Sequence, residues 1–494
     1  MKKNKKNILF ILTDQQRFDT LGCNGAPQCQ TPNIDKLAEE GVNFSHAFTP
    51  IALCSPARGS IITGLFPHNH GQLVNTSNFN GVFDKNILDK PSWIKTLHDS
   101  GFNTGYIGKW HIPREGDNEF WGIDTWHLYR DYYDELRQEG VENFFDYHGD
   151  SGMKSEWGIT NPPSWGRSGL SYEQMQETWS SNKTIETIKQ FANKDKPFMV
   201  FTSFKGPHWD YMVPPPYDTM YDPRSIDKWG NFDDPFIDKP EIQQKEILRW
   251  NAGHLTWKDW QEMIAVYWGY CSYIDDELKR IIDCLKENGI YDDTIIIFST
   301  DHGDMIGSHR IFNKGFQMYE ETHRIPFVIR DPDQDNNGIT IDSFISHVDI
   351  MPTILKYCQL STPNSTDGQS LLPLLKMENT NWRDDIFAEF HGYEPCLTSI
   401  RMVRTKNWKY VYNPFSVDEL YDLVSDPYEI HNLAPRIGHR AVLRRMKERM
   451  VDWMRKTRDD LGRKSQGRVD SFDLIYSKED MWSPSSVPGH LDNK

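Results

Sequence analysis

No stretch of this sequence is apolar enough to cross a membrane. A span needs roughly 18 to 20 consecutive apolar residues, and the 494 residues contain no run that approaches this length. Near the start, the apolar run from Ile8 to Leu12 is too short for the core of a signal peptide and gives way to Thr13 and Asp14. We therefore expect no membrane partner, and the chain as written predicts a cytoplasmic location.

The sequence also lacks an excess of basic residues. Its 55 lysines and arginines are outnumbered by 71 aspartates and glutamates, which gives a formal charge of −16 at pH 7. Nucleic acids and anionic membrane surfaces bind to basic faces, so neither is expected as a partner. If the chain binds an anion, positive charge must be gathered locally.

Cysteine pairs are missing as well. The seven cysteines are odd in number and widely spread, and no two of them form a Cys-x-x-Cys pair. This pattern predicts neither a disulfide framework nor a zinc site. Most of the seven are expected to be buried free thiols, and Cys54 stands apart only because of its neighbours.

Short apolar segments alternate with longer amphipathic ones along the chain. The apolar segments predict buried strands, and the segments between them show helical spacing, as in Met263, Val266, Tyr267 and Tyr270. Such alternation is typical of an α/β fold with a doubly wound, mainly parallel sheet. The expected strands are residues 7–12, 103–107, 198–202, 294–299 and 326–330, and the expected helices are residues 31–41, 92–100, 172–191, 257–288 and 347–357.

Parts of the sequence depart from this alternation. Residues 112–170 and 207–240 are rich in Trp, Tyr, Asp, Gly and Pro, and we expect long functional loops there. From about residue 379 the pattern changes to short strands at 385–389, 398–404 and 409–412 and then a charged helix at 441–461. We therefore expect a main domain, residues 1–378, and a smaller C-terminal α+β subdomain with a short antiparallel sheet and a tail, residues 379–494.

Two aspartates stand where predicted strands end. Asp14 follows the segment 7–12, and Asp301 follows the segment 294–299. Because binding sites of open α/β sheets form outside the carboxyl ends of the strands, these two carboxylates can meet at one cation. Each aspartate taken singly is more often a helix cap or a turn residue, so the pair needs support from other residues.

The segment Cys54-Ser55-Pro56-Ala57-Arg58 supplies that support. It resembles the modification signature of the type I sulfatases, in which the cysteine is oxidised to formylglycine. Further segments resemble the same family in the same order along the chain. They are residues 7–17, Gly101 to His111, Lys205-Gly206-Pro207-His208, Asp301-His302-Gly303, Lys314 to Pro326, and Leu420 to Leu433.

The resemblance implies an alkaline-phosphatase-like α/β/α sandwich, with residues 1–378 as the catalytic domain. It also implies one divalent metal ion held by Asp14, Gln15, Cys54, Asp301 and His302, and no organic cofactor. Gln15 and His302 depart from the commonest pattern of the family, which has a second Asp and an Asn at these positions. Hard oxygen ligands suit Ca²⁺ or Mg²⁺ and an imidazole brings Mn²⁺ into range, so Ca²⁺ is favoured while Mn²⁺ and Mg²⁺ stay open.

Charged residues in the matching segments predict an anion site. Asp14 and Asp301 about neutralise a divalent cation, which leaves Arg58, Lys109 and Lys314 as excess positive charge. Such an excess suits a sulfate monoester and the charge that develops on its bridging oxygen. Without the motifs around them, these basic residues would be interpreted as solvated surface charges.

The resemblance also implies a role for each catalytic residue. The formylglycine hydrate attacks sulfur with one hydroxyl and expels the alcohol, and the other hydroxyl then collapses to release sulfate. Arg58 holds the hydrate, His111 with Lys109 beside it takes the proton that drives the collapse, and His208 with Lys314 contacts the sulfate and protonates the leaving oxygen. The catalytic set is thus Cys54, Arg58, Lys109, His111, His208 and Lys314, whereas His68, His70, His309, His323 and His391 are expected to be structural.

Two other functions stay open. The same superfamily contains phosphodiesterases and phosphonate monoester hydrolases, and Gln15 with His302 is compatible with phosphorus chemistry. In that alternative Cys54 either stays unmodified or acts on phosphorus as formylglycine. The other alternative is a protein that binds sulfated glycans without turnover, against which the completeness of the ligand set argues. The segment Gly108 to His111 favours sulfate.

A saccharide is the expected carrier of the sulfate, as in a glycosaminoglycan fragment or another sulfated glycan. The basis is the aromatic and polar composition of residues 112–170 and 207–240, together with the frequency of carbohydrate substrates in the family. The implied partners are a sulfated small molecule or oligosaccharide and a maturation enzyme that generates formylglycine. Residues expected to contact the sugar are Asn75, Asn78, Trp165, Arg167, Trp209, Asp210 and Arg401.

Overall fold

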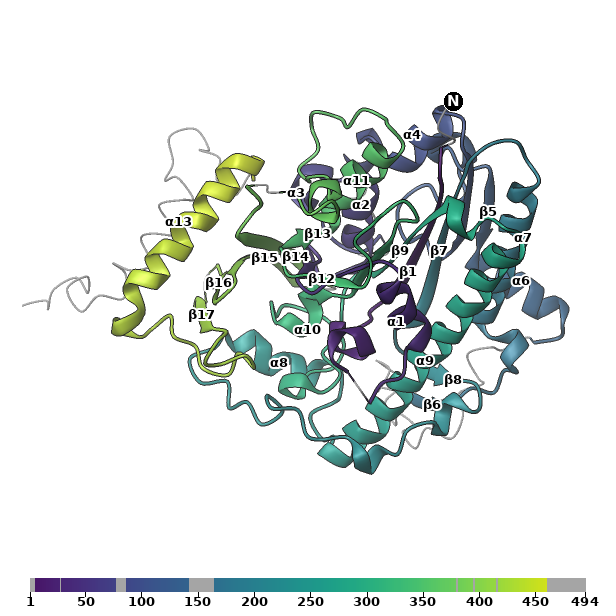
Figure 1. The fold of residues 1–494 in the computed structure, drawn as a ribbon. Coiled ribbons are helices and arrows are strands. Elements are labelled where there is room, and N and C mark those ends of the chain that lie inside the picture. Colours follow the sequence, from purple (N-terminus) through teal and green to yellow (C-terminus); the bar gives the residue numbers. More distant parts are fainter. Residues whose placement is uncertain are drawn as a thin grey trace, which may run out of the picture.

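A sheet of eight strands forms the centre of the structure (Figure 1). This computed structural model describes residues 5–26, 28–76, 86–141, 164–378, 381–393, 396–414 and 416–459. The strand order is β12-β2-β11-β9-β1-β7-β4-β5. The bounds are β1 (Asn7–Asp14), β2 (Val42–Phe44), β4 (Asn103–Gly108), β5 (Thr125–Leu128), β7 (Phe198–Pro207), β9 (Thr294–Thr300), β11 (Phe327–Arg330) and β12 (Ile339–Ile341).

The central strands are apolar along their length because both faces of the sheet are covered. β1 pairs in parallel with β7 and β9, so Leu9 lies between Val200 and Ile296, and all three are buried. Near-continuous apolar runs are typical of such doubly covered strands. The five strands expected from the sequence are confirmed. β11 runs antiparallel to β9 and β2, so the sheet is mainly rather than wholly parallel.

Helices cover both faces of this sheet and make a three-layer α/β/α sandwich (Figure 1). Alternate residues of β1 point to opposite faces, Leu9 and Ile11 to one and Ile8 and Phe10 to the other. The longest helix, α9, has 31 residues, but within the described ranges no helix is apolar enough over sufficient length to cross a membrane. The first face carries α1 (Pro32–Glu39), α7 (Gln176–Ala192) and α9 (Trp257–Glu287), and the second carries α2 (Cys54–Thr63), α4 (Trp93–Asp99) and α11 (Ile350–Tyr357).

Part of the expected loop at 112–170 is regular structure, which corrects the prediction. Strand β5 pairs in parallel with β4 and extends the sheet, and it is flanked by α5 (Asn118–Trp121) and α6 (Tyr129–Gln138). On α6 only Tyr132 and Leu136 are buried, so the apolar stripe is too narrow to predict a helix from the sequence. Downstream, β6 (Trp165–Arg167) pairs with β8 (Tyr211–Val213). Residues 142–163 lie outside the described part.

An antiparallel sheet and a long helix form a C-terminal lobe, at the left of Figure 1. Helix α13 (Arg440–Thr457) packs on the sheet through a cluster that includes Tyr410, Met450 and Trp453. The expected small antiparallel sheet is confirmed, while the boundary at residue 378 stays a prediction and the tail from residue 460 is not described. The strands are β14 (Asp385–Tyr393), β15 (Cys396–Thr405), β16 (Trp408–Tyr412) and β17 (Glu419–Asp422).

Short elements connect these layers. β3, β10 and β13 form a small three-stranded sheet beside the main one. The bounds are β3 (Ala47–Phe48), β10 (Arg324–Ile325), β13 (Ile345–Ser346), α3 (Pro67–His70), α8 (Glu241–Arg249), α10 (Glu320–His323) and α12 (Leu372–Leu375).

The cysteines whose side chains are described are free thiols. Five of them are buried and Cys23 is half-buried, as expected from their spacing. The side chain of Cys396 lies outside the described part. The buried five are Cys29, Cys54, Cys271, Cys284 and Cys358.

A buried ionic cluster joins α3 to the C-terminal lobe. His68 Nδ1 lies 2.8 Å from Glu389 Oε2, and Arg401 binds both carboxylate oxygens of Asp459 at 2.6 and 3.0 Å. Donor atoms of His68, Glu389 and Asp459 lie within 4.8 Å of one another, but Arg401 and the protonated imidazole of His68 already balance the charges of the two carboxylates. Arg401 is only 1% exposed, and its guanidinium binds Asp459 and lies beside Glu389 inside the lobe. The expectation that it contacts the sugar is therefore wrong.

The His68–Glu389 pair predicts a stability that falls at alkaline pH. Burial lowers the pKa of His68, but the charge and hydrogen bond of Glu389 outweigh it and raise that pKa to about 9, above the ordinary 6.5. A raised histidine pKa contributes stability that is fully present below pH 6.5 and lost as pH rises through about 9. We expect the free energy of unfolding to lose on the order of 3 kcal/mol across this window through His68.

Chemical denaturation at several pH values tests this prediction. The variant His68→Gln should lack this part of the slope between pH 6.5 and about 9. His254→Gln, at an exposed histidine, is the control and should keep the slope of the unmodified protein. A slope unchanged in His68→Gln would contradict the assignment.

Candidate active site

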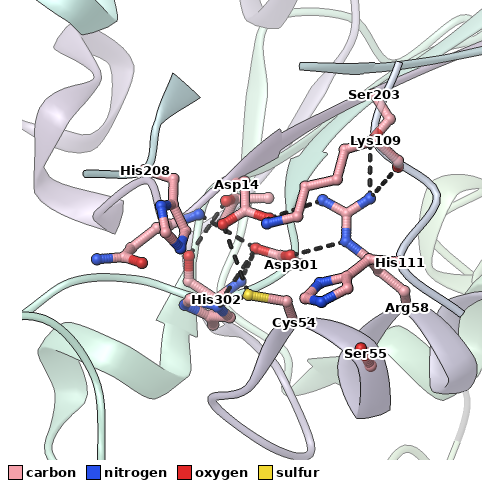
Figure 2. Close-up of polar contacts among 12 residues, drawn as sticks. Asp14, Cys54, Ser55, Arg58, Lys109, His111, Ser203, His208, Asp301 and His302 are labelled. Carbon is pink, nitrogen blue, oxygen red and sulfur yellow. Dashed lines mark hydrogen bonds and ion pairs between the residues drawn. The ribbon is translucent and has the colours of Figure 1, made fainter. Parts of the chain in front are cut away.

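Residues singled out by the sequence meet at the carboxyl ends of the central strands (Figure 2). Asp14 is the last residue of β1, and Asp301 directly follows β9. Lys109 follows β4 and His208 follows β7, while Cys54 is the first residue of α2. Because parallel strands end at the same edge of a sheet, residues far apart in the sequence come together there.

Four buried side chains converge around Cys54. Donor atoms of Asp14, Cys54, Asp301 and His302 all lie within 4.8 Å of one another. Cys54 Sγ is 3.2 Å from His302 Nε2 and 3.7 Å from Asp14 Oδ1. The two strand-end aspartates therefore lie at one point, as the sequence predicts.

His302 directs its Nε2 to this point. Its Nδ1 lies 2.9 Å from the carbonyl oxygen of Gly303. A carbonyl can only accept, so Nδ1 carries a proton and Nε2 is the nitrogen that faces Cys54. Burial lowers the pKa of His302, but Asp301 and Cys54 outweigh it and raise that pKa. Backbone contacts fix the neighbouring carboxylate, since Asp301 Oδ1 accepts from the backbone N–H groups of Gln15 and His302 at 3.1 and 2.9 Å.

The donor set fits a divalent cation. Two carboxylates, an imidazole nitrogen and a sulfur atom converge. The amide oxygen of the neighbouring Gln15 lies 2.6 Å from Lys314 Nζ. Burial, with the charge of Asp14 beside it, raises the pKa of Asp301 to about 7, as expected where carboxylates are brought together in a buried site. Oxygen and imidazole ligands of this kind suit Ca²⁺, Mg²⁺ or Mn²⁺.

Arg58 holds the two carboxylates in place. It is one turn after Cys54 on α2 and only 2% exposed. Its guanidinium donates to Asp14 Oδ2 at 2.9 Å and to Asp301 Oδ2 at 3.0 Å. The remaining nitrogen donates to Ser203 Oγ and to the carbonyl of Lys109 at 2.7 and 2.6 Å. In this structure Arg58 therefore orients the acidic residues, and the expected contact with a hydrate stays a prediction.

Lys109 and His111 lie on one side of Cys54 (Figure 2). Lys109 Nζ is 2.6 Å from Asp14 Oδ2. His111 has a positive φ of 58°, and its buried Nδ1 has no hydrogen-bond partner within the described ranges. Burial lowers the pKa of His111 and Lys109 lowers it further. A neutral imidazole beside Cys54 has the protonation state of a base.

Lys314 and His208 lie close to each other in the same site. Lys314 Nζ lies 3.0 Å from His208 Nε2, and it is only 1% exposed. His208 Nδ1 donates to the carbonyl of Trp209, so Nε2 is the acceptor of the Lys314 proton. Burial lowers the pKa of His208 to about 3, with Lys314 and Lys109 adding to the effect. In this arrangement the proton is therefore held by Lys314.

The electrostatic field of the site favours an anion at Cys54. Burial and Asp14 raise the pKa of the Cys54 thiol, but Lys109, Lys314 and His302 outweigh them and hold that pKa well below its ordinary value. Cys54 also sits at the amino end of a ten-residue helix, where the helix dipole favours negative charge. Two of the three basic residues expected to supply positive charge, Lys109 and Lys314, thus act on one atom.

The expected sugar contacts are scattered around the site. Trp209 stacks beside His208, with ring centroids 5.6 Å apart. Asn75 Oδ1 accepts from the backbone N–H of Ser55 at 3.0 Å, so this atom supports α2 instead of facing a sugar. Trp165 and Arg167 lie on β6 and Asp210 precedes β8. Trp165 is half-buried, the exposed Arg167 pairs with Asp218 at 2.7 Å, and Asp210 accepts from Ser164. Asn78 lies outside the described residues.

Two residues of the site are missing from the sequence prediction. Ser203 lies in β7 and accepts from Arg58. Asp304 is buried, three residues after Asp301, and binds the side-chain amide of Gln15. The position of Asp304 in the segment 301–304 was a usable signal, whereas a serine within an apolar strand gives none.

The sandwich, with a site at its strand ends that fits a cation and attracts an anion, is the architecture of the alkaline-phosphatase-like superfamily of hydrolases. Comparison with known protein families identifies the family within this superfamily. The family model described as Sulfatase matches residues 6–360, and the model described as N-sulphoglucosamine sulphohydrolase, C-terminal, matches residues 307–456. The chain belongs to the sulfatase family.

Individual relatives span nearly the whole chain. The arylsulfatase of Clostridium perfringens is 30% identical over 95% of this chain and 96% of its own. The N-acetylglucosamine-6-O-sulfatase of Bacteroides thetaiotaomicron is 26% identical over 87% of this chain and 82% of its own. The solved phosphonate monoester hydrolase of Agrobacterium radiobacter is 27% identical, with a TM-score of 0.78 over 92% of this chain and 96% of that one.

These likenesses bear out two expectations from the sequence. The fold is the alkaline-phosphatase-like sandwich with a small C-terminal antiparallel sheet. The activity class is that of a sulfuric ester hydrolase.

Proposed function

We propose that the chain is a formylglycine-dependent sulfatase that releases inorganic sulfate from an O-sulfated saccharide. The observation that carries the proposal is the position of Cys54. It begins a helix, lies among Asp14, Asp301 and His302, and has its thiol pKa lowered by Lys109 and Lys314. A nucleophile at this position can attack an anionic ester bound by the two lysines.

Maturation of Cys54 precedes the completion of the fold. Cys54 is only 1% exposed, and the other residues of the segment Cys54-Ser55-Pro56-Ala57-Arg58 are buried as well. A maturation enzyme cannot reach a thiol in that position, so it acts on the unfolded or nascent chain. The maturation enzyme, with an external oxidant such as O₂ that takes two electrons, converts the CH₂SH side chain into CHO; the C–S bond breaks and the sulfur leaves as sulfide. Water then hydrates the aldehyde to a geminal diol.

The aldehyde gives the reaction a second step that a thiol lacks. One hydroxyl of the diol attacks sulfur, the S–O bond to the sugar breaks, and the alcohol leaves with a proton. The other hydroxyl then loses its proton, the carbonyl re-forms, and sulfate leaves as the C–O bond to it breaks. A thiolate adduct on sulfur has no comparable route to hydrolysis.

The residues at the strand ends would bind the metal that this reaction uses. Asp14, Gln15, the modified Cys54, Asp301 and His302 would hold the divalent metal, for which Ca²⁺ is favoured. When bound, the metal supplies positive charge to the nucleophile and to the sulfate oxygens.

One group of residues accepts a proton in this reaction and another donates one. His111, neutral through burial, takes the proton that starts the collapse of the diol. Lys314 and His208, 3.0 Å apart, form the acid that protonates the leaving oxygen. Lys314 holds that proton in the resting enzyme, which sharpens the assignment made from the sequence.

Aromatic residues next to His208 support a saccharide as the carrier of the sulfate. Trp209 packs edge-on against Trp250, with ring centroids 5.4 Å apart, and the guanidinium of Arg249 lies 4.6 Å from the ring centre of Tyr393. Trp209 is only half-buried, and such a ring combines an apolar body with a polar N–H that suit a sugar. One relative is an N-acetylglucosamine-6-O-sulfatase by name, and the C-terminal part matches a model named for an N-sulphoglucosamine sulphohydrolase.

A phosphonate monoester hydrolase or phosphodiesterase is the second candidate. It is favoured by the amide and imidazole of Gln15 and His302 in the ligand set, and by the likeness to a solved phosphonate monoester hydrolase. Both reactions need a nucleophile, a cation and an anion-binding site, so geometry alone separates them poorly.

Turnover of matched substrates separates the two candidates. We expect kcat/KM for sulfate release from sulfated oligosaccharides to exceed that for phosphonate monoesters and phosphodiesters by orders of magnitude. Ion chromatography of released sulfate and phosphorus NMR measure the two reactions on one preparation. Faster phosphorus chemistry would move the assignment to the second candidate, and binding of the sulfated sugar without release would indicate a non-catalytic protein.

A further inference from the structure

The side-chain amide of Gln15 is held from two sides by groups of opposite charge. Its Oε1 accepts from Lys314 Nζ at 2.6 Å, and its Nε2 donates to Asp304 Oδ2 at 2.7 Å. All three residues are almost completely buried, at 0%, 1% and 0% exposure. In such surroundings a misoriented amide cannot turn to water for its hydrogen bonds.

Only one orientation of the amide satisfies both neighbours. If it were turned over, its NH₂ group would face the ammonium of Lys314 and its oxygen would face the carboxylate of Asp304. Each contact would then bring like partners together, two donors on one side and two acceptors on the other. Asp304 therefore selects the orientation in which the amide oxygen lies on the side of Lys314.

Asp304 is itself fixed by other parts of the fold. Its Oδ2 accepts from the hydroxyl of Tyr211 on β8 at 2.5 Å, and its Oδ1 accepts from the backbone N–H of Ile306 at 3.0 Å. Both carboxylate oxygens are thus used, and neither can move without losing a bond. Tyr211 is 0% exposed and packs edge-on against Tyr267.

The backbone of Gln15 is held as firmly as its side chain. Its φ is 67°, in the left-handed region that non-glycine residues rarely adopt. The hydroxyl of Tyr267 donates to its carbonyl at 2.8 Å, and its N–H donates to Asp301 Oδ1 at 3.1 Å. Because the backbone is anchored, Asp304 and Lys314 decide where the amide atoms point.

The same contact restricts the charge of residue 15. A carboxylate in place of the amide would face the carboxylate of Asp304 at hydrogen-bond distance, with no proton between them. Like charges at this separation and burial repel strongly. A neutral residue 15 is therefore a consequence of Asp304, and the acidic charge offered to a cation is left to Asp14 and Asp301.

We infer that Asp304 is a positioning residue that fixes the orientation of the Gln15 amide, with its oxygen at Lys314, and requires residue 15 to be uncharged. The inference rests on the metal site of the proposed function, although it needs neither formylglycine nor a sulfate ester. Asp304 acts through Gln15 and touches neither substrate nor nucleophile.

A reciprocal exchange of the two side chains tests the inference. Gln15→Glu and Asp304→Asn each leave two like groups facing one another. The double variant restores one donor and one acceptor with their positions reversed, because the new amide at 304 donates to the new carboxylate at 15. We expect Asp304→Asn to weaken Ca²⁺ and Mn²⁺ binding by about 10- to 100-fold, the usual effect of losing an outer partner of a metal ligand. We expect Gln15→Glu to weaken it as well, because the carboxylate of Asp304 repels the new carboxylate from its place.

The double variant is the decisive measurement. Competition with a chelator gives the dissociation constant for each metal alone, without substrate, on protein prepared identically. We expect the double variant to bind at least about tenfold more tightly than the product of the two single effects predicts. Gln16→Glu is the matched control: Gln16 is buried but contacts Thr13 and Thr20, so its effect should not be relieved by Asp304→Asn.

Folding itself provides a second readout. If a single variant fails to fold, the double variant should recover a cooperative thermal transition. A double variant no better than the worse single variant, or a Gln15→Glu variant that binds metal as tightly as the unmodified protein, would overturn the inference. The single and double variants can bind metal as expected while the protein shows no sulfatase activity. That result would contradict the proposed function but not this inference.

Discussion

Replacing Cys54 with alanine is expected to abolish hydrolysis of sulfate esters, with kcat/KM falling on the order of 10⁶-fold, the scale of losing a covalent nucleophile. Cys54 is buried in contact range of Asp14 and His302, so no water-exposed group can replace it. Alanine is smaller than cysteine and fits the same helical position. The loss should therefore appear in kcat, while the folded structure is kept.

Mass spectrometry of the peptide that contains Cys54 accompanies this measurement. Active protein should contain the mass expected when CH₂SH becomes CHO, and protein from a host without the maturation enzyme should contain the thiol and be inactive. Cys358→Ala, at another buried free thiol, is the control and should keep full activity. Full activity with an intact Cys54 thiol would contradict the mechanism, whatever the substrate.

The sequence predicts the central strands well because burial on both faces leaves a plain signal. Segments such as residues 7–12 and 294–299 are apolar at nearly every position, and the structure pairs them directly. Strand β5 and helix α6 give no such signal. β5 lies at the edge of the sheet, and α6 buries only Tyr132 and Leu136, so their formation depends on neighbours that the local sequence does not reveal.

The site shows the same division. Asp14 and Asp301 could be predicted to meet, because parallel strands share one edge. The residue that accepts from the Gln15 amide could not be predicted. Asp304 reaches this amide because of the turn after β9 and the hydrogen bond from Tyr211. Arg401 illustrates the opposite error. It stands directly across from Glu389 in the β14–β15 pair and binds Asp459, a use that the local sequence does not indicate.

The charged side chains of the site have partners within the site. Arg58 holds the inner oxygens of Asp14 and Asp301. Lys109 reaches Asp14, and Lys314 reaches Gln15 and His208. Every buried charge in this set has a partner of opposite sign or a hydrogen-bond acceptor, which keeps the cost of burial low. In this set, Lys314 is the residue that contacts Gln15 and also donates a hydrogen bond to the neutral imidazole of His208.

Lys314→Met is therefore expected to lower kcat/KM on sulfated sugars by about 10²- to 10⁴-fold, the usual contribution of a general acid. A sugar alcohol is a poor leaving group and needs a proton as the S–O bond breaks. An activated aryl sulfate leaves as a stable phenolate, so its turnover should fall much less. Comparing kcat/KM over a series of leaving groups measures this difference, and Lys245→Met, at an exposed lysine on α8, is the control.

His208 separates proton donation from simple binding of the sulfate. Its Nε2 accepts the Lys314 proton, and its own pKa is lowered to about 3 by burial and by the two lysines. His208→Gln keeps an acceptor for Lys314, so its loss should depend less steeply on the leaving group than the loss in Lys314→Met. Equal losses on sugar and aryl sulfates in both variants would assign the pair to sulfate binding, and the proton would then have to come from water.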